Sequence, residues 1–262
     1  MRLKNCLMAS IATIIGFFIA TQFFDYNLII VFFATFFICA GGQIINDYFD
    51  YDIDKKISKN KPLPSGIISK KIAITSSILF FVIGLTLAFL LNPISFFIAC
   101  TFTLLLILYS GLFYKKKYLG NFIVAAGTAI TFIFGASATN QIPQIIFFFF
   151  TIAFLANMAR EITKDFEDLK KDFGFKKTLP MISKKLSKSL ILFYYTTSII
   201  LAFVTGIIFS LNMYYYFFVI ITTIIFIITI QFLLKNDFSK SQSYSKKGMI
   251  VSLIAFISAV FK

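Results

Sequence analysis

The chain has 262 residues, of which 59% are hydrophobic and only 14% are charged. A water-soluble domain carries about 25% charged residues, so the composition excludes an ordinary soluble fold and predicts an integral membrane protein. The formal net charge is +14, and the absence of histidine excludes a Ser-His-Asp triad and any His-ligated metal site.

A bilayer-crossing helix needs about 20 mostly apolar residues, and nine segments of the chain approach that length. The first follows Met1-Arg2-Leu3-Lys4 and is too long for the apolar part of a signal peptide, so we interpret it as a span. Every spanning backbone must satisfy its own hydrogen bonds, which favours helices. We therefore predict an all-α polytopic membrane protein, with one transmembrane domain over residues 1–262. The predicted spans are 5–24, 28–46, 72–91, 95–113, 119–138, 143–160, 187–209, 214–234 and 247–261.

The positions of the basic residues predict the orientation of the chain. Nine spans place the connecting loops alternately on the two sides of the membrane, and every Lys and Arg except Lys262 falls on the side of the N-terminus. Positively charged loops stay in the cytoplasm, so we expect a cytoplasmic N-terminus and an external C-terminus in the cell membrane.

The excess of positive charge has two interpretations. Lysines beside a membrane contact anionic lipid headgroups, which accounts for the net charge without a specific ligand. Alternatively, some of these lysines bind an anionic substrate. Nucleic acid is not an expected partner, because the predicted loops are too short to form a binding domain.

The acidic residues are concentrated in two segments on the predicted cytoplasmic side. Nine of the eleven Asp and Glu lie within 46–54 and 160–172, after the second and the sixth predicted span. Each segment contains the spacing D-x-x-D-x-x-x-D, and steps of three and four residues keep side chains on one helical face. These residues are Asp47, Asp50 and Asp54 in the first segment, and Asp165, Asp168 and Asp172 in the second.

Helical projection adds Asn46 to the first cluster and Glu161 to the second, and turns Asp52 and Glu167 away. Carboxylates without His or Cys suit a hard ion, and Mg²⁺ usually combines one or two carboxylates with water and substrate phosphate oxygens. Two facing clusters would hold a diphosphate through Mg²⁺ and neutralise a leaving pyrophosphate. Solvated loop charges balanced by lysines are the alternative, but the repeated motif favours a metal site.

The two motifs resemble those of the UbiA-type intramembrane prenyltransferases. Residues 46–54 are similar to the first aspartate-rich motif of that superfamily, and residues 165–172 are similar to the second. The resemblance covers essentially the whole chain. Within the superfamily, segments 46–50, 60–66 and 160–168 are most similar to the archaeal digeranylgeranylglyceryl phosphate synthases, although Lys61 stands where relatives often have arginine.

The resemblance implies a reaction and a set of catalytic residues. The reaction would be Mg²⁺-dependent transfer of a geranylgeranyl group from geranylgeranyl diphosphate to the free hydroxyl of geranylgeranylglyceryl phosphate, in archaeal ether-lipid biosynthesis. An allylic diphosphate ionises once its leaving group is neutralised, so neither a histidine nor a nucleophilic side chain is needed. The implied catalytic and metal-binding residues are Asn46, Asp47, Asp50, Asp54, Asp165, Asp168 and Asp172.

Substrate binding should use cationic and aromatic side chains near the motifs. The phosphate of the acceptor needs cationic partners, although Arg160 is alternatively an anchor at the membrane interface. Aromatic faces stabilise an allylic cation, for which Tyr109 is a candidate beside Tyr48, Phe49 and Phe132, although ordinary packing explains most aromatic residues. The cationic candidates are Lys55, Lys61, Lys115, Arg160 and Lys164.

Three other functions can be compared with the pattern of paired acid clusters. A prenyltransferase that acts on an aromatic acid, as a quinone precursor, would use the same metal site with another acceptor. A cation-coupled transporter would place its acids near the bilayer midplane, whereas these acids follow the ends of the predicted spans. A purely structural membrane protein offers no reason for paired acid clusters. The sequence predicts no oligomeric state.

Overall fold

The computed structural model describes residues 3–57, 60–113 and 117–261, and the regular elements in these residues are helices. One short element, η1, is a π-helix that continues α5. The helices in chain order are α1 (Leu3–Thr21), α2 (Asn27–Phe49), α3 (Tyr51–Ile57), α4 (Lys70–Leu91), α5 (Pro93–Leu108), η1 (Tyr109–Phe113), α6 (Lys117–Ser137), α7 (Gln144–Glu167), α8 (Leu169–Asp172), α9 (Leu179–Ile182), α10 (Lys184–Ile208), α11 (Met213–Leu234) and α12 (Phe238–Ser258).

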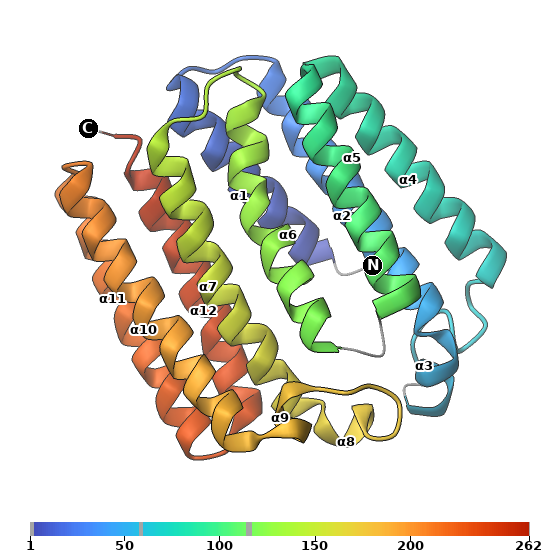
Figure 1. Ribbon diagram of the computed structural model, residues 1–262. Helices are drawn as coiled ribbons and strands as arrows, with labels where there is room; N and C mark the ends of the chain where they lie inside the picture. Colours follow the sequence, from blue (N-terminus) through green and yellow to red (C-terminus); the bar gives the residue numbers. More distant parts are fainter. Residues whose placement is uncertain (1–2, 58–59, 114–116, 262) are drawn as a thin grey trace.

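Eight helices in the described residues are long and apolar enough to cross a membrane, so the protein is a multi-pass membrane protein. The ninth predicted span is also helical, but α12 begins at Phe238 rather than near residue 247. Its first half carries Lys240, Lys246 and Lys247, which is why α12 is not among the eight apolar spans. In Figure 1, α12 nevertheless runs alongside the other long helices.

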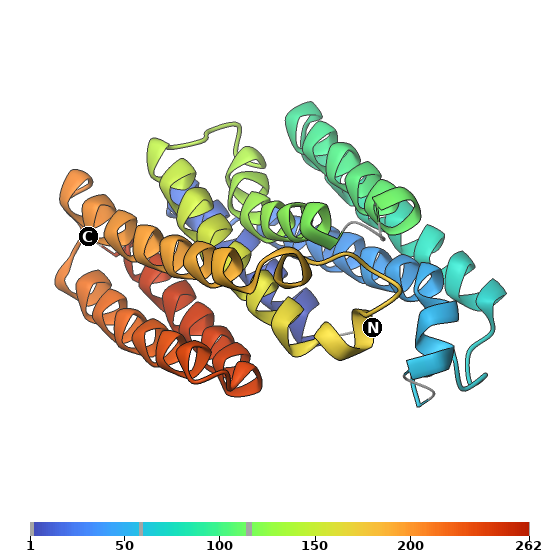
Figure 2. The ribbon, with the colours of Figure 1, turned by 60° about the horizontal axis from the view of Figure 1, so that its bottom comes forward.

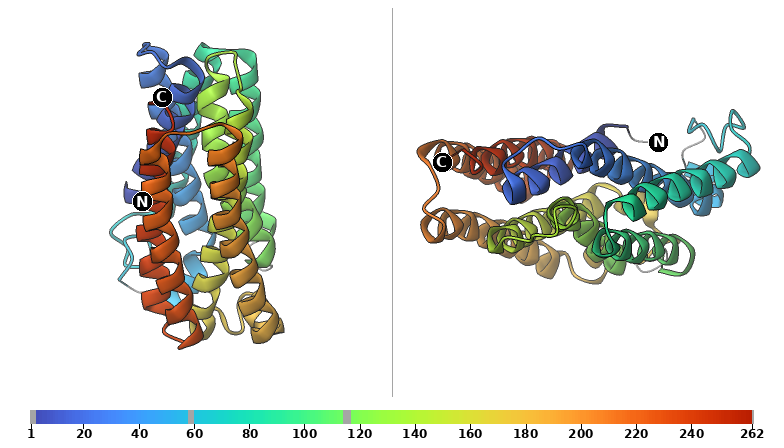
Figure 3. Two further views of the ribbon diagram at one scale, coloured as in Figure 1. Left: turned by 90° about the vertical axis from the view of Figure 1, so that its left-hand side faces the viewer. Right: turned by 90° about the horizontal axis from the view of Figure 1, so that it is seen from above.

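The long helices form two rows that pack face to face (Figure 3). One row contains α11, α12, α1, α2 and α4, and the other contains α10, α7, α6 and α5. Contacts of α1 with α6 and of α7 with α12 join the two rows in the middle, while α4–α5 and α10–α11 join them at the ends. The interior between the rows is therefore shared by helices from both halves of the chain.

Close contact between the rows depends on small residues in α1 and α6. A Cβ atom added at Gly16 would overlap the carbonyl oxygen of Phe132, and one added at Gly135 would overlap the carbonyl oxygen of Thr13. Small residues at such crossings let the helix backbones approach, as is common in membrane proteins. Hydrogen bonds between neighbouring helices add to this packing, including the one of 2.9 Å between the hydroxyls of Thr13 and Thr35.

The outer surface of the bundle is apolar. Large side chains on α4, α5, α10 and α11 leave more than half of their surface uncovered, among them Phe89, Phe97, Ile200 and Ile224. A water-soluble monomer rarely exposes apolar patches of this extent, and these faces are suited to contact lipid.

The connections that carry the acidic segments lie together at one end of the bundle. Figure 1 shows α3, α8 and α9 at its lower end, and Figure 2 brings that end forward. Helices α2 and α7 both end there, so their C-terminal residues are positioned at the same end of the interior.

Candidate active site

Both aspartate-rich motifs contain a break between two helices at their middle aspartate. Helix α2 ends at Phe49 and α3 begins at Tyr51, with Asp50 between them; α7 and α8 are separated in the same way by Asp168. The two aspartates share nearly the same backbone conformation, with φ −78° and ψ 0° at Asp50 and φ −88° and ψ 3° at Asp168.

Hydrogen bonding continues across both breaks. The amide of Asp54 donates to the carbonyl oxygen of Asp50 at 2.9 Å, and the amide of Asp172 donates to that of Asp168 at the same distance. Because this four-residue pattern is that of an α-helix, the helical spacing within each motif is largely maintained. The structure therefore gives the two motifs matching local geometry.

A cavity of about 990 Å³ lies between the two rows of helices. At the end of the bundle where the motifs lie, its wall is formed by carboxylates, lysines and amides. The remaining wall is mainly apolar and includes Ile98, Phe102, Phe132, Phe134 and Val219. The cavity thus combines a polar end with a large apolar interior.

The first predicted cluster lines this cavity as a group, with Asn46, Asp47, Asp50 and Asp54 in its wall. The side-chain amide of Asn46 donates to Oδ2 of Asp50 at 3.3 Å. Nζ of Lys61 lies 2.6 Å from Oδ2 of Asp54, which is buried. By contrast, Asp52 is exposed and lies 3.9 Å from Lys70, in agreement with the helical projection.

The second predicted cluster is divided between the cavity and the core. Asp168 and Asp172 line the cavity. Glu161, which lies on α7 about one turn before Asp165, also lines it. Asp165 is completely buried and does not belong to the wall of the cavity; its Oδ2 accepts a hydrogen bond of 2.7 Å from Asn121 of α6. Glu167, which the helical projection turned away, is exposed as expected but borders the cavity, so the projection is only partly correct there.

Lys176 is a site residue that the sequence analysis did not single out. It follows α8, and its Nζ contacts both carboxylate oxygens of Asp50, at 2.8 and 3.0 Å. In the sequence it is one of many lysines in a basic loop, so no pattern distinguishes it from a lysine that contacts lipid headgroups. Asn121 was missed for a similar reason, since a single amide within an apolar span carries no motif.

The cationic candidates occupy different places. Lys61, Arg160 and Lys164 line the cavity, whereas Lys55 lies on the exposed surface near the ring of Tyr51. Nη1 of Arg160 lies 2.6 Å from Oε1 of Glu161, and only 14% of the Arg160 side chain is exposed. Arg160 therefore belongs to the cavity wall, in contrast to the alternative of an interfacial anchor. Lys115 lies outside the described residues.

Tyr109 also lines the cavity. It is the first residue of η1, and π-helical turns frequently occur at functional sites. Gly120 of α6 leaves room for its ring, because an added Cβ there would overlap the ring. Of the other aromatic candidates, Phe132 lines the cavity, while Tyr48 and Phe49 do not belong to its wall.

The donor set of the cavity suits a hard cation in its chemistry. Carboxylates and an amide from two helices meet at one polar end, and lysine ammonium groups already contact Asp50 and Asp54 as positive partners. Among residues 3–57, 60–113 and 117–261, however, no three His, Cys, Asp or Glu side chains approach closely enough to hold a metal ion alone. Substrate oxygens would have to complete a Mg²⁺ site, as is usual for this ion.

Sequence comparison decides the family. Residues 9–257 match the UbiA prenyltransferase family. The chain belongs to this family. It is therefore a prenyltransferase, and the resemblance seen in the two motifs is confirmed. The family match spans nearly all of the chain and includes both motifs.

Individual relatives agree with this assignment. Digeranylgeranylglyceryl phosphate synthase of Methanocaldococcus jannaschii is 36% identical over 273 aligned residues, which cover 100% of this chain and 94% of that protein. A solved structure of digeranylgeranylglyceryl phosphate synthase superposes with a TM-score of 0.82 at 34% identity, over 99% of this chain and 95% of the other. A UbiA homolog from Archaeoglobus fulgidus bound to GPP and Mg²⁺ has a TM-score of 0.69 at 18% identity, covering 94% of this chain and 95% of that one, and shares the fold.

Proposed function

We propose that this protein transfers a geranylgeranyl group from geranylgeranyl diphosphate to the free hydroxyl of geranylgeranylglyceryl phosphate in a Mg²⁺-dependent reaction. The observation that carries the proposal is the form of the cavity, in which acidic and basic side chains meet at one end of a large apolar interior. A prenyl diphosphate has the same division into a charged head and an apolar chain. The similarity to synthases of this name over the whole chain supports the choice of acceptor.

The cation would be held by the residues of the motifs that line the cavity, which are Asn46, Asp47, Asp50, Asp54, Asp168 and Asp172. When bound, Mg²⁺ supplies positive charge that neutralises the diphosphate as it leaves. Asp165, which the sequence places in the same set, would act from behind the cavity by positioning the end of α7 through its contact with Asn121.

The lysines of the cavity would bind the diphosphate directly. Lys61 and Lys176 contact Asp54 and Asp50, so their ammonium groups lie beside carboxylates that would hold the cation and would donate to the oxygens of a diphosphate bound there. Charge-assisted hydrogen bonds of this kind are roughly twice as strong as neutral ones. Lys164, which also lines the cavity, would add a third cationic donor from α7.

Tyr109 and the apolar wall would stabilise the reacting allylic carbon and protect it from water. Breaking the allylic C–O bond leaves a cation on the prenyl group, and the face of Tyr109 would stabilise it. The apolar wall would exclude water, so that the acceptor hydroxyl oxygen forms the new C–O bond. Its proton would pass to an oxygen of the departing diphosphate, which gains negative charge as the allylic C–O bond breaks and becomes a stronger base.

From the positions of the lysines and arginines we infer the orientation of the protein in the membrane. The N-terminus and the polar end of the cavity would face the cytoplasm, with α12 as a ninth span in the cell membrane. Cysteines introduced singly at Lys70 and at Asn140 in an otherwise cysteine-free chain would test this in intact cells. A membrane-impermeant thiol reagent should label the second and not the first, and the reverse labelling would contradict the orientation.

Product analysis tests the reaction itself. The purified protein is incubated with geranylgeranyl diphosphate, Mg²⁺ and geranylgeranylglyceryl phosphate, and the products are identified by mass. We expect a product that contains both prenyl chains and the phosphate, together with pyrophosphate. Hydrolysis of the diphosphate without transfer would contradict the proposal.

A further inference from the structure

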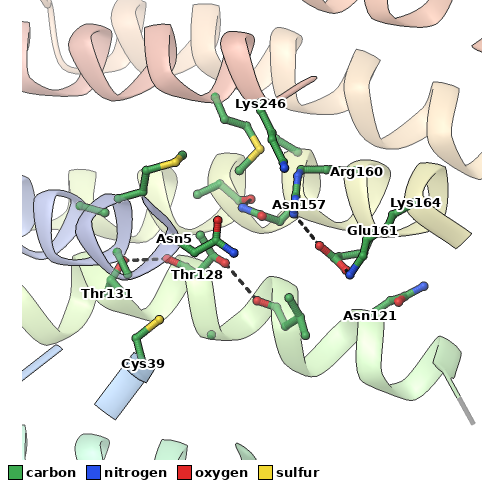
Figure 4. A pocket seen from close by; sticks show the side chains of 18 of the residues that line it. Asn5, Cys39, Asn121, Thr128, Thr131, Asn157, Arg160, Glu161, Lys164 and Lys246 are labelled. Atoms are coloured by element: carbon green, nitrogen blue, oxygen red, sulfur yellow. Dashed lines mark hydrogen bonds and ion pairs between the residues drawn. The ribbon is translucent and has the colours of Figure 1, made fainter. Parts of the chain in front are cut away.

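A second group of polar side chains lines the cavity beyond the aspartates of the two motifs. Figure 4 shows Asn5 of α1, Asn157 and Arg160 of α7 and Lys246 of α12 around one part of the cavity. They come from three helices of both rows, which places them at the junction between the rows. Arg160 precedes Asp168 by eight residues, or about 12 Å along a helix that rises about 1.5 Å per residue.

Cationic side chains outnumber the one carboxylate that they are seen to share in this part of the wall. Arg160 and Lys164 both contact Glu161, with N–O distances of 2.6 and 3.7 Å, so one carboxylate is shared by two cations. Lys246 adds a third positive charge to the same wall. Cations beside an apolar interior need compensating negative charge, because such an environment solvates them poorly. The wall is therefore suited to an anion.

The hydrogen-bond donors of the Arg160 guanidinium are also not all used within the described residues. Its Nη1 donates to Glu161, but its Nε is buried and has no hydrogen-bond partner among the described residues. A buried donor without a partner is unfavourable, and guanidinium groups present several donors in one plane. Phosphate oxygens match this donor geometry well.

We infer that Arg160 and Lys246 form a binding site for the phosphate of the acceptor lipid, with Asn5 and Asn157 as neutral donors beside it. The inference deepens the proposed function and rests on it. A donor diphosphate at the aspartate motifs leaves this second anion site about two helical turns away along α7. In the acceptor, the free hydroxyl is only a few bonds from the phosphate. A phosphate bound at Arg160 would therefore hold that hydroxyl near the donor carbon with which it reacts.

This location differs from that of the lysines of α3. Lys55 and Lys56 are exposed and lie near the rings of Tyr51 and Phe175, outside the cavity wall. Neither lysine therefore borders the interior that would hold the chain of the acceptor. The acceptor site is thus assigned to α7 and α12 rather than to α3.

The main test compares Lys246→Gln with Lys247→Gln. Both positions are on α12, but Lys247 contacts the ring of Tyr244 at 4.5 Å and does not line the cavity. We expect Lys246→Gln to raise KM for geranylgeranylglyceryl phosphate at least tenfold, while KM for the donor and kcat at saturating acceptor change less than twofold. Lys246→Arg should restore the acceptor KM, and Lys247→Gln should leave all three constants as in the wild type. An unchanged acceptor KM in Lys246→Gln would overturn the site.

A binding measurement separates this inference from the proposed reaction. Thermal unfolding is followed without donor, in the presence of geranylgeranylglyceryl phosphate, of the same lipid lacking the phosphate, or of an aromatic acid. We expect the phosphorylated lipid to raise the Tm of the wild type more than the other two, and expect Lys246→Gln and Arg160→Lys to remove most of that difference. Equal shifts with and without the phosphate, or a difference that both variants retain, would overturn the site.

The two experiments fail in distinguishable ways. If the phosphorylated lipid binds through Lys246 but yields no transfer product, the anion site stands and the proposed reaction fails. If transfer occurs but neither variant alters acceptor KM or binding, the reaction stands and the site is wrong. A preference for the aromatic acid that depends on Lys246 would contradict both the phosphate site and the choice of acceptor.

Discussion

The ammonium nitrogen of Lys176 lies 2.8 Å from Oδ1 of Asp50, although the two residues are 126 positions apart in the chain. The contact joins the segment after α8 to the break between α2 and α3, and so connects the surroundings of the two aspartate motifs. Both side chains are largely covered, with 10% and 15% of their surfaces exposed. An ion pair with so little solvent contact is less screened than a surface pair, and removing one partner leaves the other charge uncompensated.

Replacing Lys176 by glutamine should weaken donor binding. If its ammonium group binds the diphosphate, the loss of one charge-assisted hydrogen bond should raise the donor KM about tenfold, which corresponds to about 1.4 kcal/mol. Steady-state kinetics with varied geranylgeranyl diphosphate measures the effect. Lys177→Gln is the matched control, because Lys177 is exposed and does not line the cavity. Equal effects of the two substitutions would contradict the role of Lys176.

The middle aspartates should be far more sensitive than a neighbouring acid that points outward. Asp50→Ala and Asp168→Ala should each lower kcat by about 10³-fold or more, because they remove negative charge from the proposed metal site. Asp52→Ala should remain close to the wild type, since 88% of the Asp52 side chain is exposed. Glu167→Ala should have an intermediate, smaller effect. Similar losses at all four positions, measured as initial rates, would refute the assignment of the motif faces.

The two motifs were predictable from the sequence, and the contacts around them were not. Spacing alone identified the acids of the motifs and correctly turned Asp52 outward, because α-helical hydrogen bonds persist across the breaks at Asp50 and Asp168. The pairing of Lys176 with Asp50 depends on the path of a loop, which no periodic pattern encodes. Similarly, helical projection placed Asp165 and Asp168 on one face, but packing against α6 buries only Asp165 behind the cavity wall.

The ends of the helices were also less predictable than their existence. The expected sixth span stopped at residue 160, whereas α7 continues to Glu167. Its last turns carry charged residues, of which Glu161, Lys164 and Glu167 line the cavity. The lysines in the first half of α12 lower its hydropathy, so the predicted span began at residue 247 rather than at Phe238. Hydropathy detects the part of a helix suited to lipid, and it misses polar helical turns that surround a binding site.

Enlarging Gly135 should destabilise the bundle. A Cβ atom there would overlap the carbonyl oxygen of Thr13, so Gly135→Ala forces α1 and α6 apart. Overpacking of this kind costs about 1–3 kcal/mol, and we expect a clear fall in Tm in detergent. Thr101→Leu, which adds bulk at an exposed position of α5, serves as the control and should leave Tm nearly unchanged. If Gly135→Ala unfolds at the wild-type temperature, the close helix crossing is wrong.

The ring of Tyr109 should matter more than its hydroxyl. If the ring face stabilises the allylic cation, Tyr109→Phe should keep most of the activity, whereas Tyr109→Leu should lower kcat about fivefold, in line with about 1 kcal/mol for a cation–π contact. Gly120→Ala should lower kcat in the same direction, because the added methyl group displaces the ring. Turnover under saturating substrates measures these effects. Full activity in Tyr109→Leu would show that the ring has no such role.

The most direct measurement is an acceptor competition in which geranylgeranyl diphosphate is supplied with equal amounts of geranylgeranylglyceryl phosphate and an aromatic hydroxy acid, with Mg²⁺ or with EDTA. Products are separated and identified by mass, and pyrophosphate is measured in the same samples. We predict that the phosphoglyceride carrying both prenyl chains dominates, that one pyrophosphate is released per transfer, and that EDTA abolishes both. Predominant prenylation of the aromatic acid would contradict the proposed acceptor, and undiminished turnover in EDTA would contradict the metal site at the aspartate motifs.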